Sequence, residues 1–178
     1  MEEKTLASTV LYEGQIIKVR RDRVLLPNGQ ESHREIVDHE PAVVILPVDA
    51  EGRFHLIRQF RKPLENVLIE APAGLINPGE DPLVAAKREL LEETGLTALS
   101  WTPLYEGYPT PGFCNELYHL YLAEDLSEGT TSFDDDEYVE PHVLTSEQLE
   151  EHLNQGQLKD VKTTLAYLLY QRHRLSQR

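Results

Sequence analysis

The stretch GLINPGEDPLVAAKRELLEETGL, residues 74–96, determines most of what the sequence predicts about fold and function. Its second half carries the signals of a helix from Pro82 to Thr94. Asp81 can cap the first turn, Pro82 suits the first helical position, and Gly95 supplies a stop after the last turn. We therefore expect a loop rich in glycine and proline that leads directly into this helix.

Two faces separate on this helix when residues are placed at about 100° intervals. The apolar face comprises Leu83, Val84, Leu90 and Leu91. The opposite face comprises Glu89, Glu92 and Glu93 with the small Ala85 and Ala86. Like charges at this spacing cost roughly a few tenths of a kcal/mol per pair, and a divalent cation held between them removes the repulsion. Oxygen ligands suit Mg²⁺ or Mn²⁺, and the two alanines would leave space for ions and substrate. A solvated acidic surface is the alternative interpretation.

The whole stretch resembles the Nudix box at every specified position: a glycine, five residues, a glutamate, seven residues, then Arg-Glu-apolar-x-Glu-Glu-x-Gly-apolar. The resemblance implies an α/β fold, a Nudix-type α/β/α sandwich with a mixed sheet. It also implies metal-dependent hydrolysis of a nucleoside diphosphate linked to another group.

The resemblance assigns roles to particular box residues. Glu89 and Glu93 would bind the metal directly, and Glu92 would be a further or water-mediated ligand with a catalytic role. The backbone carbonyl of Ala73 could supply one more ligand, because glycine in the adjoining loop lets the backbone approach closely. Glu80 and Arg88 are expected to pair and to brace the loop against the helix.

Outside the box, strands interleaved with two or three helices are typical of an α/β sandwich. Two β-rich segments are expected within residues 15–26, and single strands within 32–37, 42–47, 53–60, 66–71 and 118–122. Further helices are expected over 146–153 and 161–174. We expect residues 1–40 to form a small N-terminal antiparallel β subdomain used in dimerisation and substrate binding. Residues 41–178 would be the Nudix hydrolase domain.

Further segments resemble the ADP-ribose pyrophosphatase branch of the family: QFRKP (59–63), EAPAG (70–74), TPGF (110–113) and REIV (34–37). The resemblance implies that Arg34 and Glu35 help to hold the adenine end across a dimer interface, and that Pro111 and Gly112 belong to the substrate loop. Arg61 could make bidentate contacts to a diphosphate. The alternatives are a surface arginine at 61, a cross-strand pair at 34–35 and a simple turn at 111–112.

The general base is expected in the acidic run Asp134–Glu137. Counting by the resemblance reaches Asp135, where the family usually has a glutamate, and Glu137 is the candidate with the longer reach. A metal-activated water that needs little help is a third possibility, and a solvated acidic loop is the structural alternative.

Charge and composition exclude other classes of function. Seventeen Lys and Arg against 31 Asp and Glu give a net charge of −14, which repels phosphate, so no nucleic-acid partner is expected. No apolar run approaches the ~20 residues needed to cross a bilayer, so no membrane partner is expected. The single cysteine, Cys114, excludes an internal disulfide, and a cytoplasmic location is expected.

The resemblance to the ADP-ribose pyrophosphatase branch implies Mg²⁺-dependent hydrolysis of ADP-ribose to AMP and ribose 5-phosphate by a homodimer, with Mn²⁺ as the alternative ion. One alternative is a diphosphatase that acts on other nucleotide sugars or on dinucleotides. Another is a non-catalytic sensor of ADP-ribose. A sensor is expected to have lost box carboxylates, and this sequence has all of them.

Overall fold

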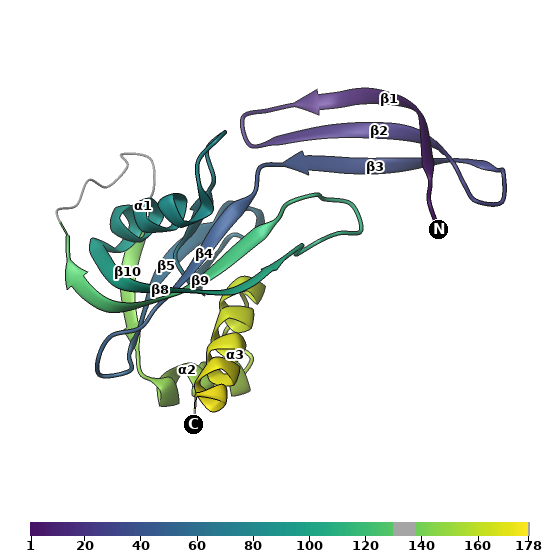
Figure 1. Ribbon diagram of the computed structural model, residues 1–178. Helices are drawn as coiled ribbons and strands as arrows, with labels where there is room; N and C mark the ends of the chain where they lie inside the picture. Colours follow the sequence, from purple (N-terminus) through teal and green to yellow (C-terminus); the bar gives the residue numbers. More distant parts are fainter. Residues whose placement is uncertain (130–137, 178) are drawn as a thin grey trace. The chain divides into compact units, whose positions relative to one another are not determined.

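A computed structural model describes residues 1–129 and 138–177 of the protein (Figure 1). The strands are β1 (Lys4–Glu13), β2 (Ile17–Leu25), β3 (Glu31–His39), β4 (Ala42–Pro47), β5 (Phe54–Arg61), β6 (Asn66–Glu70), β7 (Ala73–Leu75), β8 (Leu96–Gly107), β9 (Tyr118–Glu128) and β10 (Val139–Leu144). The helices are η1 (Lys62–Leu64), α1 (Pro82–Thr94), α2 (Ser146–Asn154) and α3 (Val161–Ser176). The chain forms two compact units, one of Met1–Pro41 with Gly107–Leu117 and one of Ala42–Glu106 with Tyr118–Arg178.

The first unit is built on an antiparallel sheet in the order β1-β2-β3. The segment 107–117 is fastened to β3, because Val37 N donates to Phe113 O at 2.7 Å and Asn115 N donates to Val37 O at 3.3 Å. The predicted N-terminal antiparallel sheet is confirmed. The expectation of two β segments within residues 15–26 is wrong, because this region forms the single strand β2, which pairs with β1 on one side and with β3 on the other.

The second unit contains sheets ordered β7-β4-β9-β8 and β10-β5-β6. Strand β4 runs parallel to β9 and antiparallel to β7, so the predicted mixed sheet is confirmed. Every residue of β4 is buried, as expected for an apolar strand covered on both faces.

Helices cover both faces of this sheet. Side chains of a strand alternate between faces, and β4 shows the consequence directly. Val44 and Leu46 pack in one apolar cluster with Tyr167 of α3, whereas Val43 and Ile45 pack in another with residues of α1. Figure 1 shows α1 and α3 on opposite sides of β4 and β9. The predicted α/β/α sandwich is confirmed.

Local signals at the helix ends explain where the helices begin and stop. The Asp81 side chain accepts hydrogen bonds from Leu83 N at 2.9 Å and Val84 N at 3.3 Å, and Gly95 ends α1 in the left-handed region with φ of 72°. Helix α2 begins with a capping box formed by Thr145 and Gln148. Within residues 1–129 and 138–177, no helix has the length and apolar character that crossing a membrane requires.

Candidate active site

The buried face of α1 differs from the one that the sequence predicts. It comprises Ala85, Ala86, Glu89, Leu90 and Glu93. Val84 was expected on the apolar face but is 56% exposed. The two alanines do not leave space for ions, because they pack against Val43 and Ile45 in the core. Their small size instead lets α1 lie close to the sheet, which brings the two adjoining carboxylates into the protein.

Two of the predicted metal ligands are fixed against β7. Glu93 Oε2 accepts a hydrogen bond from Ala73 N at 3.0 Å. A Cβ atom built on Gly74 would lie 2.0 Å from Cδ of Glu89, so only glycine leaves room for this carboxylate. The first glycine of the box therefore has a steric reason, and Glu89 and Glu93 are both less than 10% exposed.

Arg88 links the loop to the acidic face. Its Nε and Nη2 donate to the two oxygens of Glu80 at 3.1 and 3.0 Å, and Nη2 also donates to Leu75 O at 3.0 Å. These hydrogen bonds from Arg88, with a smaller contribution from Asn77, lower the pKa of Glu80 to about 2. The expected Glu80–Arg88 brace is present.

Arg88 also reaches the predicted metal ligands. Its Nη1 donates to Glu89 Oε1 at 2.6 Å and to Glu92 Oε2 at 2.9 Å. In the described part of the chain, no three His, Cys, Asp or Glu side chains converge closely enough to hold a metal ion. One guanidinium nitrogen thus supplies positive charge between two carboxylates that the sequence analysis assigned to a cation.

The donor set nevertheless fits a hard divalent ion. Glu89, Glu92 and Glu93 offer only oxygen atoms, which Mg²⁺ and Mn²⁺ prefer. Two of these carboxylates are buried, and the absence of a side chain at Gly74 leaves space for one of them, Glu89. A buried group of like charges favours a cation in the same place. The assignment of Glu89, Glu92, Glu93 and the Ala73 carbonyl as ligands stays a prediction.

Arg61, at the end of β5, has a partner that the sequence analysis did not foresee. Its Nε and Nη2 donate to Glu70 Oε1 and Oε2 at 2.8 and 2.7 Å. Glu70 is 1% exposed and also accepts a hydrogen bond from Lys162 Nζ. Burial would raise the pKa of Glu70, but the hydrogen bonds and charge of Arg61 and Lys162 outweigh it, so the pKa is lowered.

Glu70 and Lys162 are thus the main residues near the site that the sequence analysis missed. They lie 92 positions apart in the chain, so no local spacing joins them. The available signal was chemical: a glutamate at the end of an apolar strand and a lysine in the first turn of an apolar helix each need a charged partner once buried.

The first unit holds the residues predicted to bind the adenine end. On β3, Glu35 lies opposite Arg21 of β2, and Arg34 lies opposite Asp22. The Arg34 guanidinium donates to a carboxylate oxygen of Glu3 and to Ser32 Oγ. Each predicted residue therefore has an oppositely charged neighbour within its own unit, and neither role in substrate binding is tested by this geometry.

Pro111 and Gly112 lie in a turn. Phe113 N and Cys114 N both donate to Thr110 O, at 3.2 and 3.0 Å, which closes the turn around them. This agrees with the structural alternative, and it leaves their predicted contact with substrate as a prediction. The two candidates for the general base, Asp135 and Glu137, lie outside the described residues.

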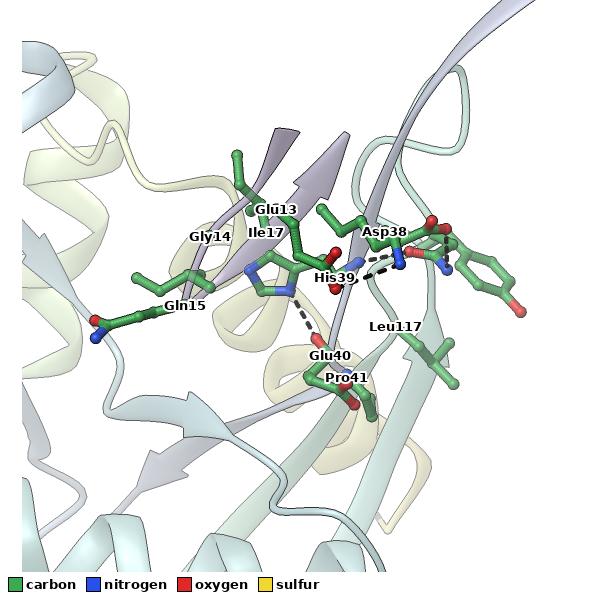
Figure 2. A pocket seen from close by; sticks show the side chains of 13 residues that line it. Glu13, Gly14, Gln15, Ile17, Asp38, His39, Glu40, Pro41 and Leu117 are labelled. Carbon is green, nitrogen blue, oxygen red and sulfur yellow. Dashed lines mark hydrogen bonds and ion pairs between the residues drawn. The ribbon is translucent and has the colours of Figure 1, made fainter. Parts of the chain in front are cut away.

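A separate pocket of about 600 Å³ opens in the first unit (Figure 2). Its lining comes from residues 13–18 and 38–41 together with Tyr108, Asn115 and Leu117. His39 N donates to Asn115 Oδ1 at 2.9 Å, and Asn115 Nδ2 contacts Asp38 Oδ1 at 3.3 Å, which fixes one wall. No predicted site residue in the described part of the chain lines this pocket.

Comparisons with known proteins place the chain in a family. A NUDIX domain model matches residues 38–165, and a nucleoside diphosphate sugar hydrolase N-terminal domain model matches residues 3–37. The chain is 43% identical over 168 residues to an ADP-ribose pyrophosphatase of Bacillus subtilis, which covers 93% of this chain and 91% of that protein. It is 40% identical over 167 residues to a methanol dehydrogenase activator of Bacillus methanolicus, with 93% and 90% covered.

The fold has a solved counterpart. The crystal structure of an ADP compounds hydrolase superimposes with a TM-score of 0.89 and covers 99% of this chain and 96% of that one, at 23% sequence identity. That likeness concerns the architecture, while the domain models and the relatives identify the family. The box residues, their helix and these matches agree: the chain belongs to the Nudix family of hydrolases.

Proposed function

We propose that the protein is a divalent-metal-dependent ADP-ribose diphosphatase that yields AMP and ribose 5-phosphate. The observation that carries the proposal is the intact set of box carboxylates on α1, two of them buried beside a glycine that leaves room for the Glu89 carboxylate. The name of the Bacillus subtilis relative, which matches nearly the full chain, supports ADP-ribose as the substrate.

Glu89, Glu93, Glu92 and the carbonyl of Ala73 would hold Mg²⁺, with Mn²⁺ as the alternative ion. When bound, such an ion lowers the pKa of a water molecule and offsets charge on the phosphoryl oxygens. The residues of the chain prepare this site. Glu80 holds Arg88 from the loop side, and Ala73 N orients the Glu93 carboxylate.

Arg61 would contact the diphosphate. Glu70 occupies only one edge of its guanidinium, and the side chain is 41% exposed. The remaining N–H groups can donate to two oxygens of one phosphate. For the adenine end we propose Arg34 and Glu35 with Pro111 and Gly112, and for the general base Glu137 or Asp135.

We also propose that the working form is a homodimer in the cytoplasm. Apolar side chains of the first unit are exposed on β1 and next to β2: Leu6, Val10, Leu11, Tyr12 and Ile16. A second copy that covers them would remove apolar surface from water. The single cysteine suits a reducing compartment.

A second candidate function is hydrolysis of other nucleotide sugars. The observation that favours it is the match of residues 3–37 to the N-terminal domain of nucleoside diphosphate sugar hydrolases. Both candidates use the same carboxylates, so they differ in the group beyond the diphosphate. Small differences in pocket contacts determine such preferences.

The test measures product release from ADP-ribose, ADP-glucose, GDP-mannose and NADH with Mg²⁺. Wild type is compared with Glu93→Gln and with the matched control Glu150→Gln, an exposed carboxylate on α2. We expect preferential turnover of ADP-ribose, lost by at least about a hundredfold in Glu93→Gln and kept in the control. Better turnover of a sugar nucleotide would support the second candidate. Tight binding of ADP-ribose with no turnover would overturn the enzyme assignment in favour of a sensor.

A further inference from the structure

Lys162, in the first turn of α3, is a buried lysine whose charge is matched by two carboxylates. Its side chain is 8% exposed, and Nζ contacts both Glu70 Oε2 and Asp160 Oδ2, the latter at 3.1 Å. A lysine is rarely buried without such partners, because removing its charge from water is costly. The position lies outside the Nudix box, so the box chemistry does not explain it.

Glu70 connects Lys162 to Arg61, because its carboxylate accepts hydrogen bonds from both. Because Glu70 receives Nε and Nη2 of Arg61 through its two oxygens, it holds the guanidinium by one edge and fixes its plane. An arginine has five N–H donors in a rigid fork. The three that Glu70 does not engage belong to the outer part of the fork, on a side chain that is 41% exposed. That outer part is suited to a second bidentate anion.

Within the group of ion-paired side chains that holds Arg61, the charges balance only when Lys162 is included. Arg61 and Lys162 are positive, and Glu70 and Asp160 are negative. The hydrogen bonds of Glu70 raise the pKa of Arg61 most strongly, and the charges of Asp160 and Glu93 raise it further. Arg61 lies near the acidic face of α1, because α1 contacts β5 and because its partner Glu70 stands three residues before Ala73, whose N donates to Glu93 at 3.0 Å. A diphosphate would meet the metal ligands there.

The same turn of α3 also fixes the backbone beside Glu70. Ala71 N donates to Thr163 Oγ1 at 2.6 Å, and the Thr163 hydroxyl donates to Asp160 Oδ2 at 2.5 Å. The next residues are tied as well, since Ile45 N donates to Pro72 O at 2.8 Å and Ala73 N donates to Glu93. Residues 70–74 are thus held at nearly every position.

We propose that Lys162 and Glu70 are positioning residues that hold Arg61 with the outer part of its fork directed to the diphosphate of a nucleotide substrate. The proposal rests on the proposed function, since it takes Arg61 as the group that contacts the diphosphate. Lys162 acts through Glu70, holding that carboxylate in place by its hydrogen bond, and it does not touch the substrate itself.

A double-mutant cycle tests this role. The variants are Lys162→Met, Arg61→Ala and both together, with Lys159→Met as the control, an exposed lysine three positions away. The Kd of the non-hydrolysable α,β-methylene-ADP-ribose is measured by calorimetry, and kcat and KM are measured with ADP-ribose. We expect Lys162→Met to weaken binding about tenfold, mostly through Kd and KM, while Lys159→Met changes nothing.

In the Arg61→Ala background we expect Lys162→Met to have no further effect on Kd, because the group it positions is gone. Equal losses of affinity in both backgrounds would overturn the proposal and leave Lys162 as a brace of the fold alone. Thermal unfolding of every variant identifies a protein that fails to fold. If Lys162→Met does not fold, Glu70→Gln replaces it in the cycle, and it is expected to weaken binding severalfold because one charged acceptor is lost.

Failure of the proposed function gives a different result. If wild type hydrolyses a nucleotide sugar in place of ADP-ribose, the assigned substrate is wrong, and the cycle is repeated through kcat/KM with that nucleotide sugar. Coupling between positions 61 and 162 would then support the positioning role in spite of the wrong substrate. Additivity would overturn the positioning role whichever substrate is used.

Discussion

Strand β4 is apolar throughout, strand β1 mixes apolar and polar residues, and the two strands have opposite surroundings. All of Ala42–Pro47 is buried, whereas every residue of Lys4–Glu13 is exposed. Burial of apolar surface is the main favourable term in folding. The chain therefore stabilises β4 with its own helices, while β1 has only its pairing with β2 and exposes apolar side chains such as Val10 and Tyr12. Both segments thus form strands, but different interactions stabilise them.

The largest effect is expected from removing one aromatic ring of β5 that packs in the same core cluster as Val44 and Leu46 of β4, which tests the contrast between buried and exposed strand residues. Phe54 is fully buried and meets Tyr167 and Tyr170 edge-on at 5.4 and 5.3 Å. Phe54→Ala is expected to lower the free energy of unfolding by about 3–5 kcal/mol, measured by urea denaturation. Phe60→Ala, on the same strand but 51% exposed, is the matched control and should cost less than about 1 kcal/mol. Similar losses at both positions would contradict the contrast.

A smaller effect is expected at Gly74, where the backbone of β7 lies against the Glu89 carboxylate. Gly74→Ala places a Cβ atom 2.0 Å from Cδ of Glu89, so the carboxylate or α1 must move. We expect a loss of about 1–3 kcal/mol in stability and a loss of hydrolysis larger than the stability change explains. Gly112→Ala in the first unit meets no atom within 4 Å and should leave the unfolding midpoint unchanged. An unaltered unfolding midpoint for Gly74→Ala would show that the Glu89 carboxylate moves away at little cost in stability.

A third test compares ion pairs by their pH dependence. The pKa of Glu80 falls from 4.5 to about 2 beside Arg88, so the native state binds this proton less readily than the unfolded chain. Its contribution is therefore complete above pH 4.5 and is lost as the pH falls toward about 2. Glu80→Gln should flatten the decline of Tm over this interval. Glu31→Gln, in an exposed pair with Arg23, is the control and should leave the slope as in wild type.

The smallest effect on the folded chain is expected on β1. Tyr12→Ser removes an aromatic ring that is 58% exposed and should change the stability of the monomer by less than about 0.5 kcal/mol. If a second copy covers this strand, the same change should shift the monomer–dimer equilibrium toward monomer. Sedimentation velocity over a range of concentrations measures this. A wild-type protein that stays monomeric at high concentration would refute the proposed dimer.

The sequence predicted the parts of the fold that local chemistry determines. Helix α1 begins and ends as Asp81, Pro82 and Gly95 indicated, and the capping box placed the start of α2 correctly. Strand β4 was evident as a short continuous apolar run. In each case the signal lies within a few residues of the structure it specifies, so no knowledge of distant contacts was needed.

Strands β1, β7, β8 and β10 were not predicted, and β1 shows a physical reason. Strand β1 is exposed on both faces, so its apolar residues show no period of two that would mark a buried side. The assignment of buried and exposed faces on α1 was limited too, because it used the local sequence alone. Projection alone cannot tell that Val84 is exposed or that Ala85 and Ala86 pack on the sheet, because that depends on how closely the helix approaches its neighbours.

The sequence predicted which residues form the candidate site better than it predicted the contacts between them. The box identified the carboxylates and the Glu80–Arg88 brace, which are close in sequence. It did not show that Arg88 also reaches Glu89 and Glu92 or that Arg61 is held by Glu70. Those contacts depend on tertiary packing, and the Lys162–Glu70 bond spans 92 positions.

That long separation has a consequence for how the protein is made. The segment that begins at Glu70 is synthesised early, whereas Lys162 and Thr163, which hold Glu70 and Ala71, are added 92 codons later. A nascent chain therefore carries every box carboxylate once Glu93 is added, whereas Glu70 lacks its lysine until Lys162 follows. If Lys162 positions Arg61 as proposed, the last factor of about ten in nucleotide affinity is gained only after Lys162 has left the ribosome.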